Sequence, residues 1–211
     1  NGVGLTTRVM VTDIDELSVE NTGTGNIMLA DVDDLDIVGE LSGGLGVWST
    51  GSSLGLGQVD IRTNSGDLNV LAKIQTDDAG FTNGSVQLTA EAGSIQVASR
   101  LETSIGFVSL KASDDVVFTS SGNITARGGS RTIDVLAQTG SVTMDERAKI
   151  DSNDRDATNH GNVRVEAAQD ITLGRVTAGE GQVTVKSSGA LLDADVSDAA
   201  EDLRVNINAQ D

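Results

Sequence analysis

Short runs of alternating apolar and polar residues fill most of the chain. The pattern of glycine, any residue, apolar, any residue, apolar occurs nine times, at GNIML (25–29), GQVDI (57–61), GDLNV (66–70), GSVQL (84–88), GSIQV (93–97), GFVSL (106–110), GSVTM (140–144), GNVRV (161–165) and GQVTV (181–185). A period of two residues with Val and Ile enriched is typical of β-strands. We find no convincing helical period of 3.6 residues, so the sequence predicts an all-β protein.

Similar strands return at a longer spacing. One series of apolar positions is Val86, Val108, Ile133, Val163, Val183 and Leu203, and a second, offset series is Ile95, Val116, Val142 and Ile171. A single coil cannot bury its own inward side chains, whereas stacking on the next coil covers them. Because parallel connections are almost always right-handed, we predict a right-handed parallel β-helix (β-solenoid). At about 20–22 residues per coil, the chain would form roughly ten coils.

The repeats are less regular in residues 1–56 than in residues 57–211. In the first part, apolar pairs recur about every nine or ten residues, which suits single strands followed by tight turns. No linker separates the two parts, so we predict one continuous domain over residues 1–211. The chain begins with Asn1. We therefore expect a processed product or an internal piece of something longer. The sequence also shows no amphipathic capping helix at either terminus, so we expect either that a longer chain continues the solenoid or that identical subunits stack end to end.

The composition is consistent with a narrow core. Aromatic residues make up only 2% of the chain, while there are 25 glycines and no proline or cysteine. Aliphatic side chains must therefore fill the interior, and many turns must connect strands whose backbone N–H groups are all available for pairing. Without cysteine, disulfides and thiolate chemistry are excluded.

The charge excludes one class of partner. The chain has 32 acidic and 14 basic residues, for a net charge of −18. Nucleic-acid binding requires clustered Lys and Arg against the phosphates, so no nucleic-acid partner is predicted. No apolar run approaches the 18 or more residues of a membrane span, and we predict no membrane insertion.

Several segments of the sequence resemble a known class of proteins. The stretches SGDLNVLA, GSVQLTAEAGSIQVAS and GNVRVEAAQDITLGRVTAGEGQVTVKS resemble the repeat regions of filamentous-haemagglutinin-like, β-strand-repeat bacterial exoproteins. The likeness is clearest over residues 57–192. It implies a secreted or cell-surface shaft that serves in adhesion, in a biofilm matrix or in a filament.

The residues do not assemble a catalytic motif. His160 is the one histidine, and the pair Asp114–Asp115 together with His160–Gly161 loosely resembles polysaccharide hydrolases built on β-helices. The further acidic and basic motifs of such enzymes are missing, so we predict a non-catalytic structural or adhesive protein. The alternatives are a β-helix module that binds a surface glycan or a host receptor and, less favoured, a polysaccharide-degrading enzyme.

Two further features are candidates for binding. Asp31, Asp33, Asp34 and Asp36 lie close together in DVDDLDIVGE and are candidate calcium ligands, because calcium is bound by carboxylate and carbonyl oxygens. The alternative for them is a solvated acidic face, and no other cofactor is predicted. Trp48 is expected in the core, with a contact to a neighbouring subunit as the alternative.

Overall fold

A computed structural model describes residues 9–23, 25–50, 57–76, 84–104, 106–127, 132–152 and 161–195, and every regular element in these ranges is a β-strand. The strands are β1 (Met10–Thr12), β2 (Glu16–Leu17), β3 (Val19–Asn21), β4 (Ile27–Asp31), β5 (Leu35–Ile37), β6 (Leu45–Ser49), β7 (Val59–Thr63), β8 (Leu68–Val70), β9 (Lys73–Thr76), β10 (Val86–Ala90), β11 (Ile95–Val97), β12 (Arg100–Thr103), β13 (Val108–Ala112), β14 (Val116–Phe118), β15 (Asn123–Ala126), β16 (Ile133–Ala137), β17 (Val142–Met144), β18 (Lys149–Asp151), β19 (Val163–Ala167), β20 (Ile171–Leu173), β21 (Arg175–Thr177), β22 (Val183–Ser187) and β23 (Leu191–Asp193). Within these ranges no helix is long and apolar enough to cross a membrane.

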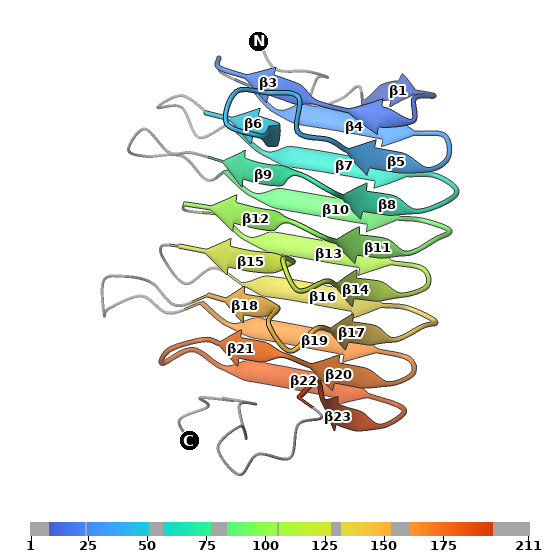
Figure 1. The fold of residues 1–211 in the computed structure, drawn as a ribbon, viewed down its shortest axis with the longest axis vertical. Helices are drawn as coiled ribbons and strands as arrows, with labels where there is room; N and C mark the ends of the chain where they lie inside the picture. The colour runs from blue at the N-terminus through green and yellow to red at the C-terminus, as the bar shows by residue number, and fades with distance from the viewer. Residues whose placement is uncertain are drawn as a thin grey trace.

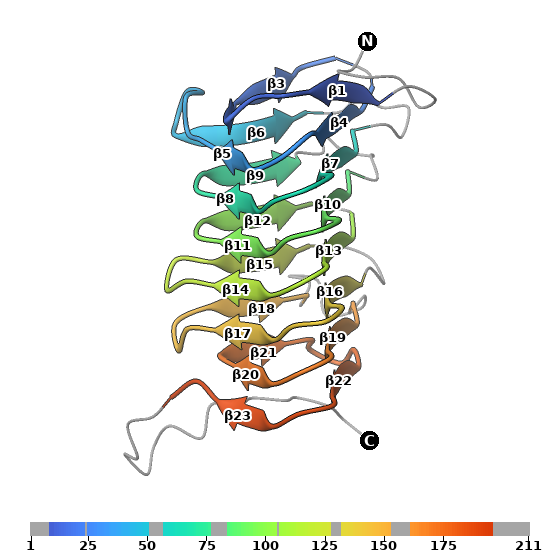
Figure 2. The same cartoon turned by 90° about the vertical axis from the view of Figure 1, so that its right-hand side faces the viewer.

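The strands form three parallel sheets that share one helical axis (Figure 1). The first sheet has the order β1-β4-β7-β10-β13-β16-β19-β22, the second β2-β5-β8-β11-β14-β17-β20-β23, and the third β21-β18-β15-β12-β9-β6-β3. Three successive strands therefore make one coil, and each strand pairs with its equivalent in the coils above and below. The coils wind as a right-handed helix (Figure 2). This confirms the predicted parallel β-helix.

Both predicted apolar series lie in register down the interior. Val86 pairs with Val108, and the same row continues through Ile133 and Val163 to Val183. In the second sheet Ile95, Val116, Val142 and Ile171 form an equivalent row. Leu203, the last member predicted for the first row, lies outside the described residues.

The number of coils differs from the prediction. The first and second sheets have eight strands each, so the described residues form about eight coils rather than the ten predicted, over about 34 Å. The paired residues Val163 and Val183 are 20 apart in sequence, but Ile27 and Val59 are 32 apart. The number of residues between equivalent strands therefore varies from coil to coil, and the predicted coil length of 20–22 residues applies to only some of them.

A thin aliphatic core fills the space between the sheets. A single cluster of buried residues extends from Leu17 to Ala178, and nearly all its members are Val, Ile, Leu or Ala. Phe118 is the one aromatic side chain in it. In the irregular N-terminal part, Leu17 and Val19 belong to two successive strands of one coil rather than to a single strand. The near absence of aromatics thus follows from the narrow interior.

Long and short inserts are closed by the same hydrogen bond. At the end of the third-sheet strand, Thr76 Oγ1 donates to the Gly84 carbonyl oxygen (2.8 Å), and Thr103 Oγ1 donates to that of Gly106 (2.9 Å). Ser152 Oγ donates to the Gly161 carbonyl in the same way (2.6 Å). The three bonds span eight, three and nine residues. The corner into the next coil is therefore fixed independently of how many residues the insert contains.

We expect Thr76→Val to lower the free energy of unfolding by about 1–3 kcal/mol, because it leaves the Gly84 carbonyl without its buried donor. Ser49 is the matched control. It lies in the same row, is equally buried, and its Oγ has no hydrogen-bond partner in the described part of the chain. Ser49→Ala should be close to neutral in the same urea titration. Equal losses for the two variants would contradict the role given to this bond.

A second ladder of hydrogen bonds joins the turns that lead into the second sheet. Asp34 Oδ1 accepts from the backbone N–H of Asp67 (2.6 Å), and Asp67 Oδ1 accepts from that of Ser94 (2.8 Å). Further along, Asp115 Oδ1 accepts from the Ser141 N–H (2.7 Å). Each polar side chain thus holds the next coil in register, which explains why a short polar residue recurs immediately before the strand.

Candidate functional site: the outer face of the third sheet

The outer face of the third sheet separates its charges into two rows. One, here called the basic row, contains Lys73, Arg100, Asn123, Lys149 and Arg175, each one residue before an inward-facing aliphatic side chain. The other, called the acidic row, contains Glu20, Trp48, Gln75, Glu102, Thr125, Asp151 and Thr177. The rows lie two residues apart along each strand, so their side chains point to the same side of the sheet. Four of the chain's 14 basic residues lie in a single row.

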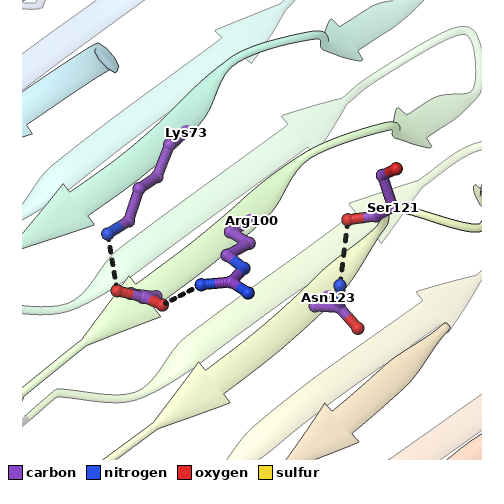
Figure 3. A network of polar contacts seen from close by, with 5 residues as sticks. Lys73, Arg100, Ser121 and Asn123 are labelled. Carbon is purple, nitrogen blue, oxygen red and sulfur yellow. Dashed lines mark hydrogen bonds and ion pairs between the residues drawn. The ribbon is translucent and has the colours of Figure 1, made fainter. Parts of the chain in front are cut away.

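Ion pairs connect the two rows (Figure 3). Glu102 lies between two cations, with Lys73 Nζ 2.7 Å from Oε2 and Arg100 Nη1 3.6 Å from Oε1. The first pair bridges neighbouring coils, whereas the second lies within β12. Lys149 pairs with Asp151 within β18. The face therefore carries mixed charge in a protein that is strongly acidic as a whole.

The structure places Trp48 on this face rather than in the core. Its neighbours in the row are Glu20 and Gln75, and the indole is half-buried. Alternation explains the difference from the sequence-based expectation, because Val47 and Ser49 on either side of Trp48 both face inward. A large apolar side chain therefore lies partly exposed next to the charged rows.

The four aspartates proposed as calcium ligands do not converge. Asp31 is fully buried at the end of β4 and accepts from Thr12 Oγ1 (2.6 Å). Asp34 lies in the turn ladder, and Asp36 faces outward from β5, where it accepts from Asn69 Nδ2 (2.9 Å). Among the described residues no group of three or more His, Cys, Asp or Glu side chains is arranged to hold a metal ion. The calcium site stays a prediction without converging ligands.

Asp33, the remaining member, lies exposed in the same turn. Desolvation, and after it repulsion from the carboxylates of Asp13, Asp31, Asp34 and Asp15, raises the pKa of Asp33 above its ordinary value. Crowded carboxylates favour a proton on one of their number. This turn is therefore an acidic surface whose charges oppose one another.

The carboxylates considered for catalysis also have structural partners. Asp115 belongs to the turn ladder, and Asp114 Oδ1 accepts from Thr139 Oγ1 (3.1 Å). His160 lies outside the described residues. A general acid or base must reach a bound substrate. The hydrogen bonds of Asp114 and Asp115 instead connect one coil to the next.

We expect Asp60→Asn to raise the free energy of unfolding at neutral pH. Asp60 is half-buried on the outer face of the first sheet, and desolvation raises its pKa although Arg62 opposes the shift. A carboxyl group with a raised pKa destabilises the folded state above that pKa, and the penalty disappears when the pH falls below its ordinary value of about 3.8. The two proteins should therefore become equally stable near pH 3. If the free energy of unfolding of Asp60→Asn exceeded that of the wild-type protein by the same amount at pH 3 and at pH 7, the prediction would be contradicted.

Comparison of the chain with protein-family models, with curated proteins and with solved structures found no match.

Proposed function

We propose that this chain is a rigid, non-catalytic shaft segment of a secreted bacterial surface adhesin or of an extracellular filament. The observation that carries the proposal is the continuity of the interior. The row from Ile27 through Val86 and Val163 to Val183 runs through seven coils without a break. A column of this kind resists bending because every coil is bonded to its neighbours along all three sheets. Such a structure is suited to holding other groups at a distance.

The last described coil supports continued stacking. The inward-facing Val183 and Val185 are only partly buried, and Leu191 is 54% exposed. In the coils above, the equivalent residues Val163, Val165 and Ile171 are almost fully buried. An open strand edge is a template for another strand. The partner in this proposal is a further coil, supplied by residues that follow along the chain or by an identical subunit.

Small-angle X-ray scattering on two copies joined end to end would test the shaft. We expect the maximum dimension to increase by about the length of one solenoid while the cross-sectional radius stays constant, as for a continuous rod. A pair-distance distribution typical of two particles joined by a flexible hinge would contradict the proposal.

Immunogold electron microscopy of intact producing cells tests the location. We expect label on structures outside the cell envelope, lost after external protease treatment. Label that appears only in sectioned cells and survives this treatment would exclude a surface role.

A further inference from the structure

The separation of charge on the third sheet has a consequence for how two copies can meet. Within the seven strands of the third sheet, all the cations lie in the basic row, and all the anions, Glu20, Glu102 and Asp151, lie in the acidic row. With four basic and three acidic side chains, these strands are together nearly neutral in a molecule of net charge −18. These strands therefore add little to the repulsion that the net charge creates between two approaching copies.

The two rows are complementary to themselves under one symmetry operation. A two-fold axis parallel to the long axis of the solenoid, placed between the rows, puts the basic row of one copy against the acidic row of the other at the same coil. Arg100 then faces Glu102 of the second copy, and Lys149 faces Asp151. Each contact occurs twice, as in any isologous interface. The match arises because each pair lies on one strand, two residues apart.

Other arrangements of the same face are unfavourable. A two-fold axis perpendicular to the long axis gives antiparallel shafts and places the basic row on the basic row, which is repulsive. The first sheet lacks this selectivity, because Asp134 and Arg164 occupy the same outward row and pair with each other (2.8 Å). Of these two sheets, the third is thus the one whose charges distinguish parallel from antiparallel pairing.

Trp48 supplies an apolar contact for the same interface. The chain's one tryptophan lies half-buried in the acidic row. Under the two-fold operation it faces the part of β6 around Leu45 in the second copy. Tryptophan is enriched among the residues that contribute most to binding at interfaces. An aromatic contact would therefore accompany the ion pairs.

We propose that two copies of this chain pair side by side and parallel through the outer faces of their third sheets. The partner is a second copy because the charges and the aromatic group are matched by the same face. The pairing does not depend on export, so it can fail while the proposed function stands. For a shaft, it would double the cross-section without changing the length.

Two charge variants test the pairing by sedimentation velocity at 0.15 M salt, where screening reduces long-range repulsion more than contact pairs. The first carries Arg100→Glu and Lys149→Glu, and the second carries Glu102→Lys and Asp151→Lys. We expect the wild-type protein to dimerise and each variant alone to dimerise at least about tenfold more weakly. A one-to-one mixture of the variants should restore the dimer, which also shows that both are folded. A monomeric wild type, or a mixture that stays monomeric, would overturn the proposal.

The relative direction of the two copies can be measured with one spin label. The chain has no cysteine, so Val11→Cys provides a single site near the N-terminal end, where Val11 is 69% exposed. Parallel copies place the two labels at the same level, whereas antiparallel copies separate them by about the length of the solenoid. Only the longer separation, measured by double electron–electron resonance, would overturn the parallel arrangement.

The competing occupant is an anionic polymer. Dextran sulfate serves as the probe for binding of such a polymer. The variant with Arg100→Glu and Lys149→Glu serves as the control. Binding to a wild-type protein that shows no dimer, with loss of binding in the first variant, would assign the basic row to a polyanion and would overturn the pairing of copies.

Discussion

Leu88→Ala is expected to lower the free energy of unfolding by about 3 kcal/mol, within the usual 2–5 kcal/mol for truncating a buried leucine. Leu88 is fully buried and stacks between Ile61 and Leu110. The cavity would therefore open at the interfaces with both adjacent coils. In a solenoid these nearest-neighbour interfaces supply much of the stability. The coil cannot collapse into the cavity, because its backbone is bonded to the strands above and below.

Gln87→Ala is the matched control, because Gln87 precedes Leu88 on β10 and is exposed. We expect its effect to lie within about 0.5 kcal/mol. Urea denaturation followed by far-ultraviolet circular dichroism measures both. Similar losses for the two variants would mean that the alternation of inward and outward positions is wrong.

Gly106→Ala is expected to cost about 3 kcal/mol, at the upper end of the range for overpacking. A Cβ atom at this position would overlap the Gly84 carbonyl oxygen and would lie 2.7 Å from Ser85 Cα. Both groups are backbone atoms of the coil before it, and they are held there by the sheet. The methyl group therefore has to push two coils apart.

Gly43→Ala separates this effect from the conformational freedom of glycine. Gly43 has a φ of 79°, but an added Cβ would have no atom within 4 Å. Its replacement should cost about 1 kcal/mol, from the left-handed backbone alone. The midpoint temperature of thermal unfolding should be clearly lower for Gly106→Ala than for Gly43→Ala. The reverse order would mean that the coils can separate at this corner at little cost.

The sequence alone determined the fold class and the inward-facing rows of two of the three sheets. Runs such as GSVQL and GSIQV contain at least two inward residues each, so their alternation is visible without any partner strand. Their recurrence identified the rows of Val86 and Ile95, because inward positions must be covered by similar residues in the next coil. Burial at these positions is a local requirement, and it leaves a local pattern.

The number of coils was decided only by the tertiary structure. A coil can accept a polar insert at low cost, because the entropy of closing a loop rises slowly with its length. The bonds from Thr76 to Gly84 and from Ser152 to Gly161 then close inserts of different length in the same way. Dividing the chain by one repeat length therefore overestimated the coils.

The third sheet and its charged face were also invisible in the sequence. Most of its strands bury one large aliphatic residue, such as Ile74, Leu101 or Ile124, which is too short a run to show a period. Lys73, Arg100 and Lys149 lie 27 and 49 residues apart and share no motif. Only the pairing of strands across the coils brings them into one row, because register depends on hydrogen bonds between segments that are distant along the chain.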